Sequence, residues 1–169
     1  RAADYFFQVS SEVRPWIAAV QADGRGLMQT STAQLGGRKL FLWGTAAGGR
    51  HWQEWLCGQA SRYLEIQAGL ATTQLEHLRL EAKAELSWAE AYAPIEASPR
   101  AVHGSWPDAL TEVAELLSRA IPVEELDEWH RWWRAEVADR APQQMAAGSG
   151  AGEAELVVRG EDPDSLPGA

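Results

Sequence analysis

The carboxylate of Glu65 lies between two apolar residues in the segment Tyr63-Leu64-Glu65-Ile66-Gln67. Successive side chains of a β-strand point to opposite faces, so in a strand Glu65 shares a face with Tyr63 and Gln67. Two interpretations stay open. The segment is either a half-exposed strand with a polar outer face, or part of a cleft. In the cleft, partial burial tunes Glu65 as a general base, and Gln67 is its hydrogen-bonding neighbour.

Two other chemistries find no support in the sequence. The glycine-rich segment 44–50 lacks the Gly-Lys-Ser/Thr ending of a phosphate-binding loop, so we expect a turn between strands there. The four histidines and the single Cys57 show no Cys-x-x-Cys or His-Glu-x-x-His spacing. We therefore expect neither a metal site nor a cofactor.

Short segments of strand-like composition, separated by turn residues, must position Glu65. Asp23-Gly24 favours a tight hairpin turn between two of them. Residues 86–92 suit a strand or a helix by propensity, and the alternation of Trp88, Glu90 and Tyr92 with small residues favours a strand. The other expected strands cover residues 4–9, 14–21, 26–32, 39–43 and 62–67. Strands of this length and spacing predict an antiparallel sandwich.

The pattern becomes helical after Pro94, where we place a boundary. Ser105 and Pro107 are typical of a helix start, and apolar residues then recur at helical spacing over residues 110–117. Pro122 opens a second helix with an acidic first turn. Periodicity ends near Ala141. The sequence thus predicts a β region over 1–95, a helical extension over 96–140 and a flexible tail over 141–169.

Composition narrows the class of protein further. The chain has 169 residues, a net charge of −9 and nine tryptophans. Its acidity argues against nucleic-acid and anionic-membrane partners, which favour basic patches. The lone Cys57 fits a reducing compartment, so we expect a cytoplasmic protein, and we expect this small side chain to be at least half-buried. The chain begins with Arg1, so we expect a piece of a longer protein.

Four ordered motifs carry a resemblance to a known superfamily over about residues 4–95. Leu64-Glu65-Ile66-Gln67 is similar to the Leu-Glu-Thr-Gln stretch around the catalytic glutamate of galactose mutarotases, also called aldose 1-epimerases. A bacterial branch of this superfamily resembles the chain at all four motifs, with similar helices after them. The motifs lie at residues 37–44, 49–53, 63–69 and 73–77. The resemblance implies a mainly β fold: the C-terminal part of an antiparallel β-supersandwich followed by two α-helices.

The resemblance also implies roles for individual residues. Glu65 matches the catalytic base. The family's general-acid histidine belongs to an upstream part of the domain that this chain lacks, and the Pro-Asp-Ala-x-Asn loop is replaced by residues 70–73. We therefore expect the missing N-terminal part of the same protein to be a partner, and this chain alone to be inactive. The residues expected to contact a sugar are Trp43, Arg50, Trp52, Gln53, Gln67 and His77.

The expected function is carbohydrate binding of the aldose epimerase type, with a sugar or sugar derivative as partner. In the catalytic version, Glu65 removes the proton of the anomeric hydroxyl while an acid protonates the ring oxygen. The alternative is a non-catalytic carbohydrate-recognition or scaffold module of a larger protein, with its helices docking elsewhere. Tryptophan suits both, since its ring is apolar and its indole N–H is polar.

Overall fold

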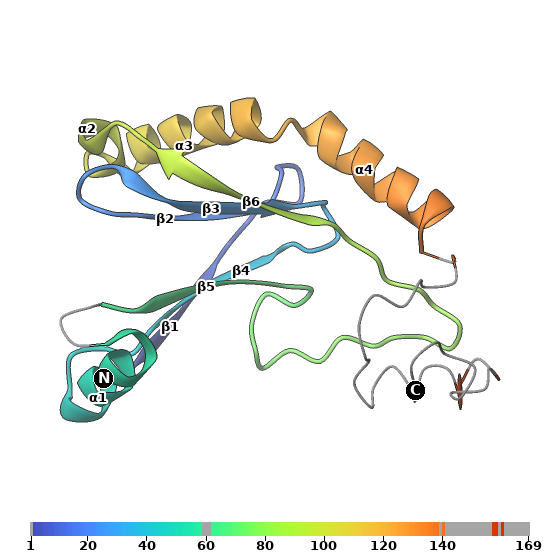
Figure 1. Ribbon diagram of the computed structural model, residues 1–169, viewed down its shortest axis with the longest axis horizontal. Coiled ribbons are helices and arrows are strands. Elements are labelled where there is room, and N and C mark those ends of the chain that lie inside the picture. The colour runs from blue at the N-terminus through green and yellow to red at the C-terminus, as the bar shows by residue number, and fades with distance from the viewer. Residues whose placement is uncertain (1, 59–61, 139, 141–156, 159, 161–169) are drawn as a thin grey trace, which may run out of the picture. The chain divides into compact units, whose positions relative to one another are not determined.

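Two antiparallel three-stranded sheets and four helices make up the described part of the chain in this computed structural model (Figure 1). The described residues are 2–58, 62–138, 140, 157–158 and 160. The chain divides into two compact units, residues 1–132 and 133–169, and both sheets belong to the first. The tail expected over 141–169 lies outside the described residues apart from 157–158 and 160.

The first sheet has the order β1-β4-β5, with β4 in the middle. Its strands are β1 (Ala3–Phe7), β4 (Gly37–Leu42) and β5 (Leu64–Gly69). Paired residues of antiparallel strands share a face, so the register of Phe41 with Glu65 and of Lys39 with Gln67 places these four side chains together. Arg38 alternates with them and belongs to the opposite face.

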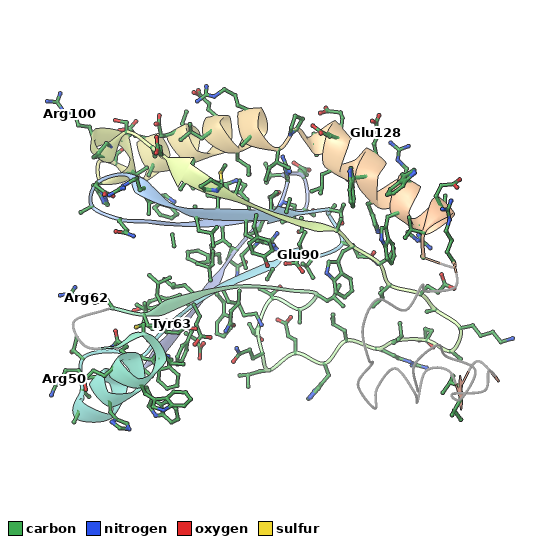
Figure 2. All side chains as sticks on the ribbon, viewed as in Figure 1. Arg50, Arg62, Tyr63, Glu90, Arg100 and Glu128 are labelled. Atoms are coloured by element: carbon green, nitrogen blue, oxygen red, sulfur yellow. The ribbon has the colours of Figure 1, made fainter. Side chains whose placement is uncertain are left out.

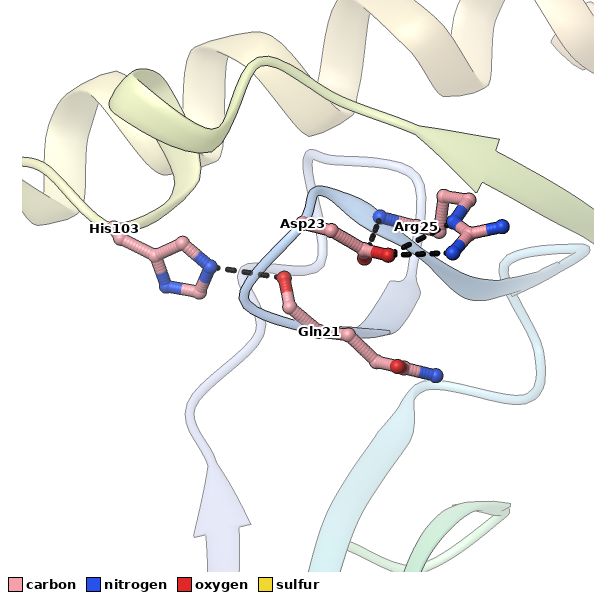
Figure 3. A network of polar contacts seen from close by, with 4 residues as sticks. All are labelled: Gln21, Asp23, Arg25 and His103. Carbon is pink, nitrogen blue, oxygen red and sulfur yellow. Dashed lines mark hydrogen bonds and ion pairs between the residues drawn. The ribbon is translucent and has the colours of Figure 1, made fainter.

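The second sheet has the order β2-β3-β6 and begins with the expected hairpin. Its strands are β2 (Trp16–Val20), β3 (Arg25–Ser31) and β6 (Glu90–Glu96). Gly24 takes a φ of +86° in the turn, a conformation that favours glycine. Asp23 accepts hydrogen bonds from the Arg25 side chain at 2.7 and 2.9 Å (Figure 3). His103, after α2 (Pro99–Val102), is hydrogen-bonded to the Gln21 carbonyl at 2.9 Å, which ties that segment to the hairpin (Figure 3).

The hydrophobic core lies between this second sheet and α3 (Trp106–Ala120), which covers one of its faces (Figure 1). The buried members of the core are Met28, Ile95, Ala97, Val113 and Leu117. The predicted helix start is confirmed, and Ser105 caps it, because Ser105 Oγ accepts a hydrogen bond from the Asp108 amide at 3.2 Å. The predicted second helix is α4 (Val123–Glu136), which starts directly after Pro122.

Arg38 connects the two sheets through its hydrogen bonds. Its side chain is fully buried, and its two terminal nitrogens donate to four oxygens: those of Leu35, Gly37, Pro15 and the Ser31 hydroxyl. Burial lowers the pKa of this guanidinium to about 10, and the negative charge of Glu90 opposes that shift.

The expected antiparallel sandwich is confirmed by the two three-stranded sheets. The helices contribute so much that the fold is mixed rather than mainly β.

Three expectations about individual segments were wrong. The helix α1 (Ala47–Cys57) includes residues 47–50 of the segment 44–50, where a turn between strands was expected. Within residues 86–92 only the last three are in a strand, β6, which continues through Pro94 to Glu96. Cys57 is exposed at the end of α1. No helix among the described residues has the length and apolar character needed to cross a membrane.

Candidate functional site

Glu65 and Gln67 form a hydrogen-bonded pair on β5. Gln67 Nε2 donates to Glu65 Oε2 at 3.0 Å, and Gln74 Nε2 donates to Gln67 Oε1 at 3.3 Å. Glu65 and Gln67 are both half-buried. Among the described residues, Glu65 Oε1 has no hydrogen-bond partner. This oxygen is therefore available to accept a hydrogen bond from a ligand.

A cluster of rings begins beside Glu65 on the same face of the sheet. Phe41, the cross-strand partner of Glu65, meets Trp43 edge to face with ring centroids 4.9 Å apart. Trp43 stacks on Trp52 at 5.4 Å, and Trp52 meets Trp55 edge to face at 5.6 Å. We call Phe41, Trp43, Trp52 and Trp55 the aromatic cluster. Its outer members are open to solvent, with Trp52 43% and Trp55 71% exposed.

Helix α1 brings two of these tryptophans to the sheet. Gln53 Nε2 donates to the Gly44 carbonyl at 2.9 Å, and Gln53 Oε1 accepts from the Tyr63 amide at 3.2 Å. The helix is thus fixed to the end of β4 and to the start of β5, and Figure 2 shows Tyr63 beside it. A Cβ at Gly49 would lie 2.1 Å from the Trp43 carbonyl oxygen, so only glycine permits this close approach.

The structure brings together some of the residues predicted for the site and separates others. Glu65, Gln67, Trp43 and Trp52 meet on one face, either directly or through Phe41. Gln53 is engaged in holding α1.

Arg50 and His77, both predicted for the site, make no contact with Glu65 among the described residues. The Arg50 guanidinium donates to the Thr45 carbonyl within its own turn, and no ion pair joins it to Glu65 among the described residues. His77 is exposed in the segment after β5, and no contact with Glu65 is observed within the described ranges. No group of three metal-binding side chains occurs in the part of the chain described here.

Sequence reasoning missed Trp55, whose signal was its spacing of three residues from Trp52 on a helix that was taken for a turn. Sequence reasoning also missed a second carboxylate, that of Glu90. Glu90 Oε2 accepts from Tyr92 at 2.8 Å and from Gln29 at 3.1 Å, and Glu90 Oε1 accepts from the Trp88 indole at 3.1 Å. Burial, followed by this bond to Glu90, raises the pKa of Tyr92. Figure 2 places Glu90 on β6.

Comparison with known proteins gives one result. The family described as a domain of unknown function (DUF5107) matches residues 6–99, a span that includes all of the strands β2 to β6 and the last two residues of β1. No curated protein and no solved structure matches the chain.

Proposed function

The chain belongs to the DUF5107 family, and because that family's description assigns no function, we propose from the site itself that this is a carbohydrate-binding domain of the aldose epimerase type. The observation that carries the proposal is the Glu65–Gln67 pair, which lies on the same sheet face as the aromatic cluster.

The chemistry of this face matches that of a sugar. A pyranose offers hydroxyl groups at its rim and C–H groups on its two ring faces. Glu65 Oε1 can accept from a hydroxyl, and such a bond to a charged group is stronger than one between neutral groups. The exposed rings of Trp52 and Trp55 offer apolar faces with a polar N–H, which suits the C–H groups of a sugar.

The resemblance to mutarotases extends the proposal to a reaction. Glu65 would take the proton of the anomeric hydroxyl while an acid protonates the ring oxygen. The bond between the anomeric carbon and the ring oxygen then breaks, and the open-chain aldehyde recloses at its other face. The general-acid histidine that the resemblance implies has no counterpart among the histidines of residues 1–169. We therefore expect residues 1–169 to bind a sugar without accelerating anomer exchange.

A recognition module within a larger assembly is the second candidate, and one observation favours it. Trp129 and Trp132 on α4 are 61% and 51% exposed, with ring centroids 5.5 Å apart. Two adjacent exposed indoles are unusual on a helix whose role is only to cover a core. In this version the Glu65 face still binds the sugar, and α4 contacts another protein.

Isothermal titration calorimetry with glucose and galactose, which keep the anomeric hydroxyl, tests the proposal. We expect saturable binding that Glu65→Gln weakens about tenfold or more, since the charged acceptor is lost. The matched control is Glu96→Gln, the same substitution at an exposed strand position of the other sheet, which should bind as the unchanged protein does. Equal affinities in Glu65→Gln and the unchanged protein would remove Glu65 from the site.

Polarimetry of glucose and galactose separates binding from catalysis. We expect anomer exchange at the uncatalysed rate in the presence of the protein. An acceleration that Glu65→Gln abolishes would show that the chain is an enzyme with an acid we have not identified. An acceleration that survives Glu65→Gln would contradict the role of Glu65.

A further inference from the structure

A pocket of about 470 Å³ lies at the end of the first sheet away from the aromatic cluster. Three segments form it: the loop from β1 to β2, the loop from β3 to β4, and the residues after β5. The aromatic cluster lies where β4 ends, whereas this pocket lies where β4 begins and β5 ends. Glu65 is not among its lining residues.

Buried polar side chains hold two of these segments in place. The Pro15 carbonyl accepts from Thr30 Oγ1 at 2.8 Å and from Arg38 at 3.0 Å. The Leu35 carbonyl accepts from Ser31 Oγ at 3.0 Å and from Arg38 at 2.6 Å. Such bonds fix the loops before a ligand arrives, so that less conformational entropy is lost on binding.

The pocket lining is uncharged and contains both polar and apolar residues. None of the residues that line the pocket has an ionisable side chain. Gln8, Ser11 and the Thr72 hydroxyl make no side-chain hydrogen bond to the described residues, and the Gln34 amide uses only its oxygen, which accepts from the Ser87 amide at 3.4 Å. The apolar part of the lining consists of Phe7, Val9, Val13, Pro15 and Leu70 beside smaller residues.

We propose that this pocket binds a neutral sugar of one or two units, at a site separate from the Glu65 face and independent of the proposed function. Its volume falls in the range of small-molecule sites, about 300–1,000 Å³. Free amide and hydroxyl groups can exchange hydrogen bonds with sugar hydroxyls, and Phe7 with its aliphatic neighbours can contact ring C–H groups.

The absence of charged side chains in the pocket lining disfavours the binding of acidic sugars and sugar phosphates there. An anion in this pocket would lose water without gaining a cation, which is costly. Arg38 lies behind the walls, and its terminal nitrogens already donate to four oxygens. The chain's net charge of −9 opposes an anion as well.

The test is a titration followed by the backbone amide signals of Gly36 and Thr72 in ¹⁵N-resolved NMR spectra. The probes are methyl glucoside and cellobiose, compared with glucose 6-phosphate and glucuronate. We expect saturable shifts of both signals with the neutral sugars, and at least about tenfold weaker binding of the charged ones. Absence of shifts with the neutral sugars, or equal binding of the charged ones, would overturn the proposal.

A pair of matched variants links the signal to the pocket. Ala33 and Ala84 are both exposed in turns, but only Ala33 lines the pocket. Ala33→Trp fills part of the volume and should weaken binding about tenfold or more, whereas Ala84→Trp should have no effect. Thermal unfolding of both variants confirms that they fold. Unchanged binding in folded Ala33→Trp would place the sugar elsewhere.

Glu65→Gln separates this site from the proposed one. The pocket shifts should persist in that variant even where the Gln67 amide and the Trp52 and Trp55 indole signals no longer respond to the sugar. Loss of both together would mean that one site explains all the binding, and would contradict a second site.

Discussion

Gln67 holds one oxygen of Glu65 and leaves the other open, through the 3.0 Å bond from Gln67 Nε2 to Glu65 Oε2. Residues two apart on a strand lie on the same face, so β5 itself sets this geometry. Gln74 in turn donates to Gln67 Oε1, which fixes the orientation of the amide.

The first prediction concerns this amide. Gln67→Met keeps the length of the side chain but removes the donor, and it should weaken sugar binding about fivefold to tenfold. Gln74→Met is the control, because it removes only the outer bond and should have a smaller effect. Calorimetry with glucose and galactose measures both. A larger loss in Gln74→Met than in Gln67→Met would contradict the order of contacts.

The second prediction compares two tryptophans of α1. Trp52 stacks on Trp43, whereas Trp55 is 71% exposed and meets only Trp52 among the cluster. Trp52→Ala should lower the free energy of unfolding by about 2–3 kcal/mol, because it uncovers Trp43. Trp55→Ala should cost less than about 1 kcal/mol. Urea unfolding followed by circular dichroism gives both values, and equal costs would show that α1 is not anchored through Trp52.

The third prediction concerns the buried guanidinium. Arg38→Lys cannot donate to four oxygens from two fixed nitrogens, and should lower the free energy of unfolding by about 2–4 kcal/mol. Arg100→Lys makes the same exchange at an exposed position and should leave stability within about 0.5 kcal/mol. Urea midpoints that shift equally in the two variants would be inconsistent with the role of Arg38.

The fourth prediction is a pH dependence at the β2–β3 hairpin. Hydrogen bonds from Arg25 lower the pKa of Asp23. Because the folded pKa is depressed, this carboxylate stabilises the fold above the ordinary carboxyl pKa, and the contribution is lost as the pH falls through the lowered value. Asp23→Asn should therefore melt slightly below the unchanged protein at neutral pH, and the two melting temperatures should converge in acid. A difference that persists undiminished in acid would exclude a charge effect.

Local sequence signals predicted the strands β1 to β5, because each of these signals depends only on residues that are neighbours in the chain. Alternation identified β5, and Asp23-Gly24 identified the turn between β2 and β3. Helix α1 was not predicted, because Gly48 and Gly49 at its start are residues typical of loops. In the structure, Gly49 lets the helix approach Trp43 closely.

The rest of the candidate site depends on contacts between residues that are distant in the sequence. Glu65 meets Phe41 through strand register, and the aromatic cluster joins β4 to α1. The Glu90 contacts join Gln29 on β3 to residues of β6, and no spacing rule links positions so far apart.

The central claim is that a sugar occupies the face formed by Glu65, Gln67 and the exposed end of the aromatic cluster. The most direct measurement is an NMR titration of side-chain N–H signals with galactose and glucose. We predict saturable shifts, with a single dissociation constant for each sugar, at the Gln67 amide and at the Trp52 and Trp55 indoles. Trp106, an indole 65% exposed on α3, should stay unchanged. No shift at Gln67, or equal shifts at Trp106 and Trp52, would contradict the claim.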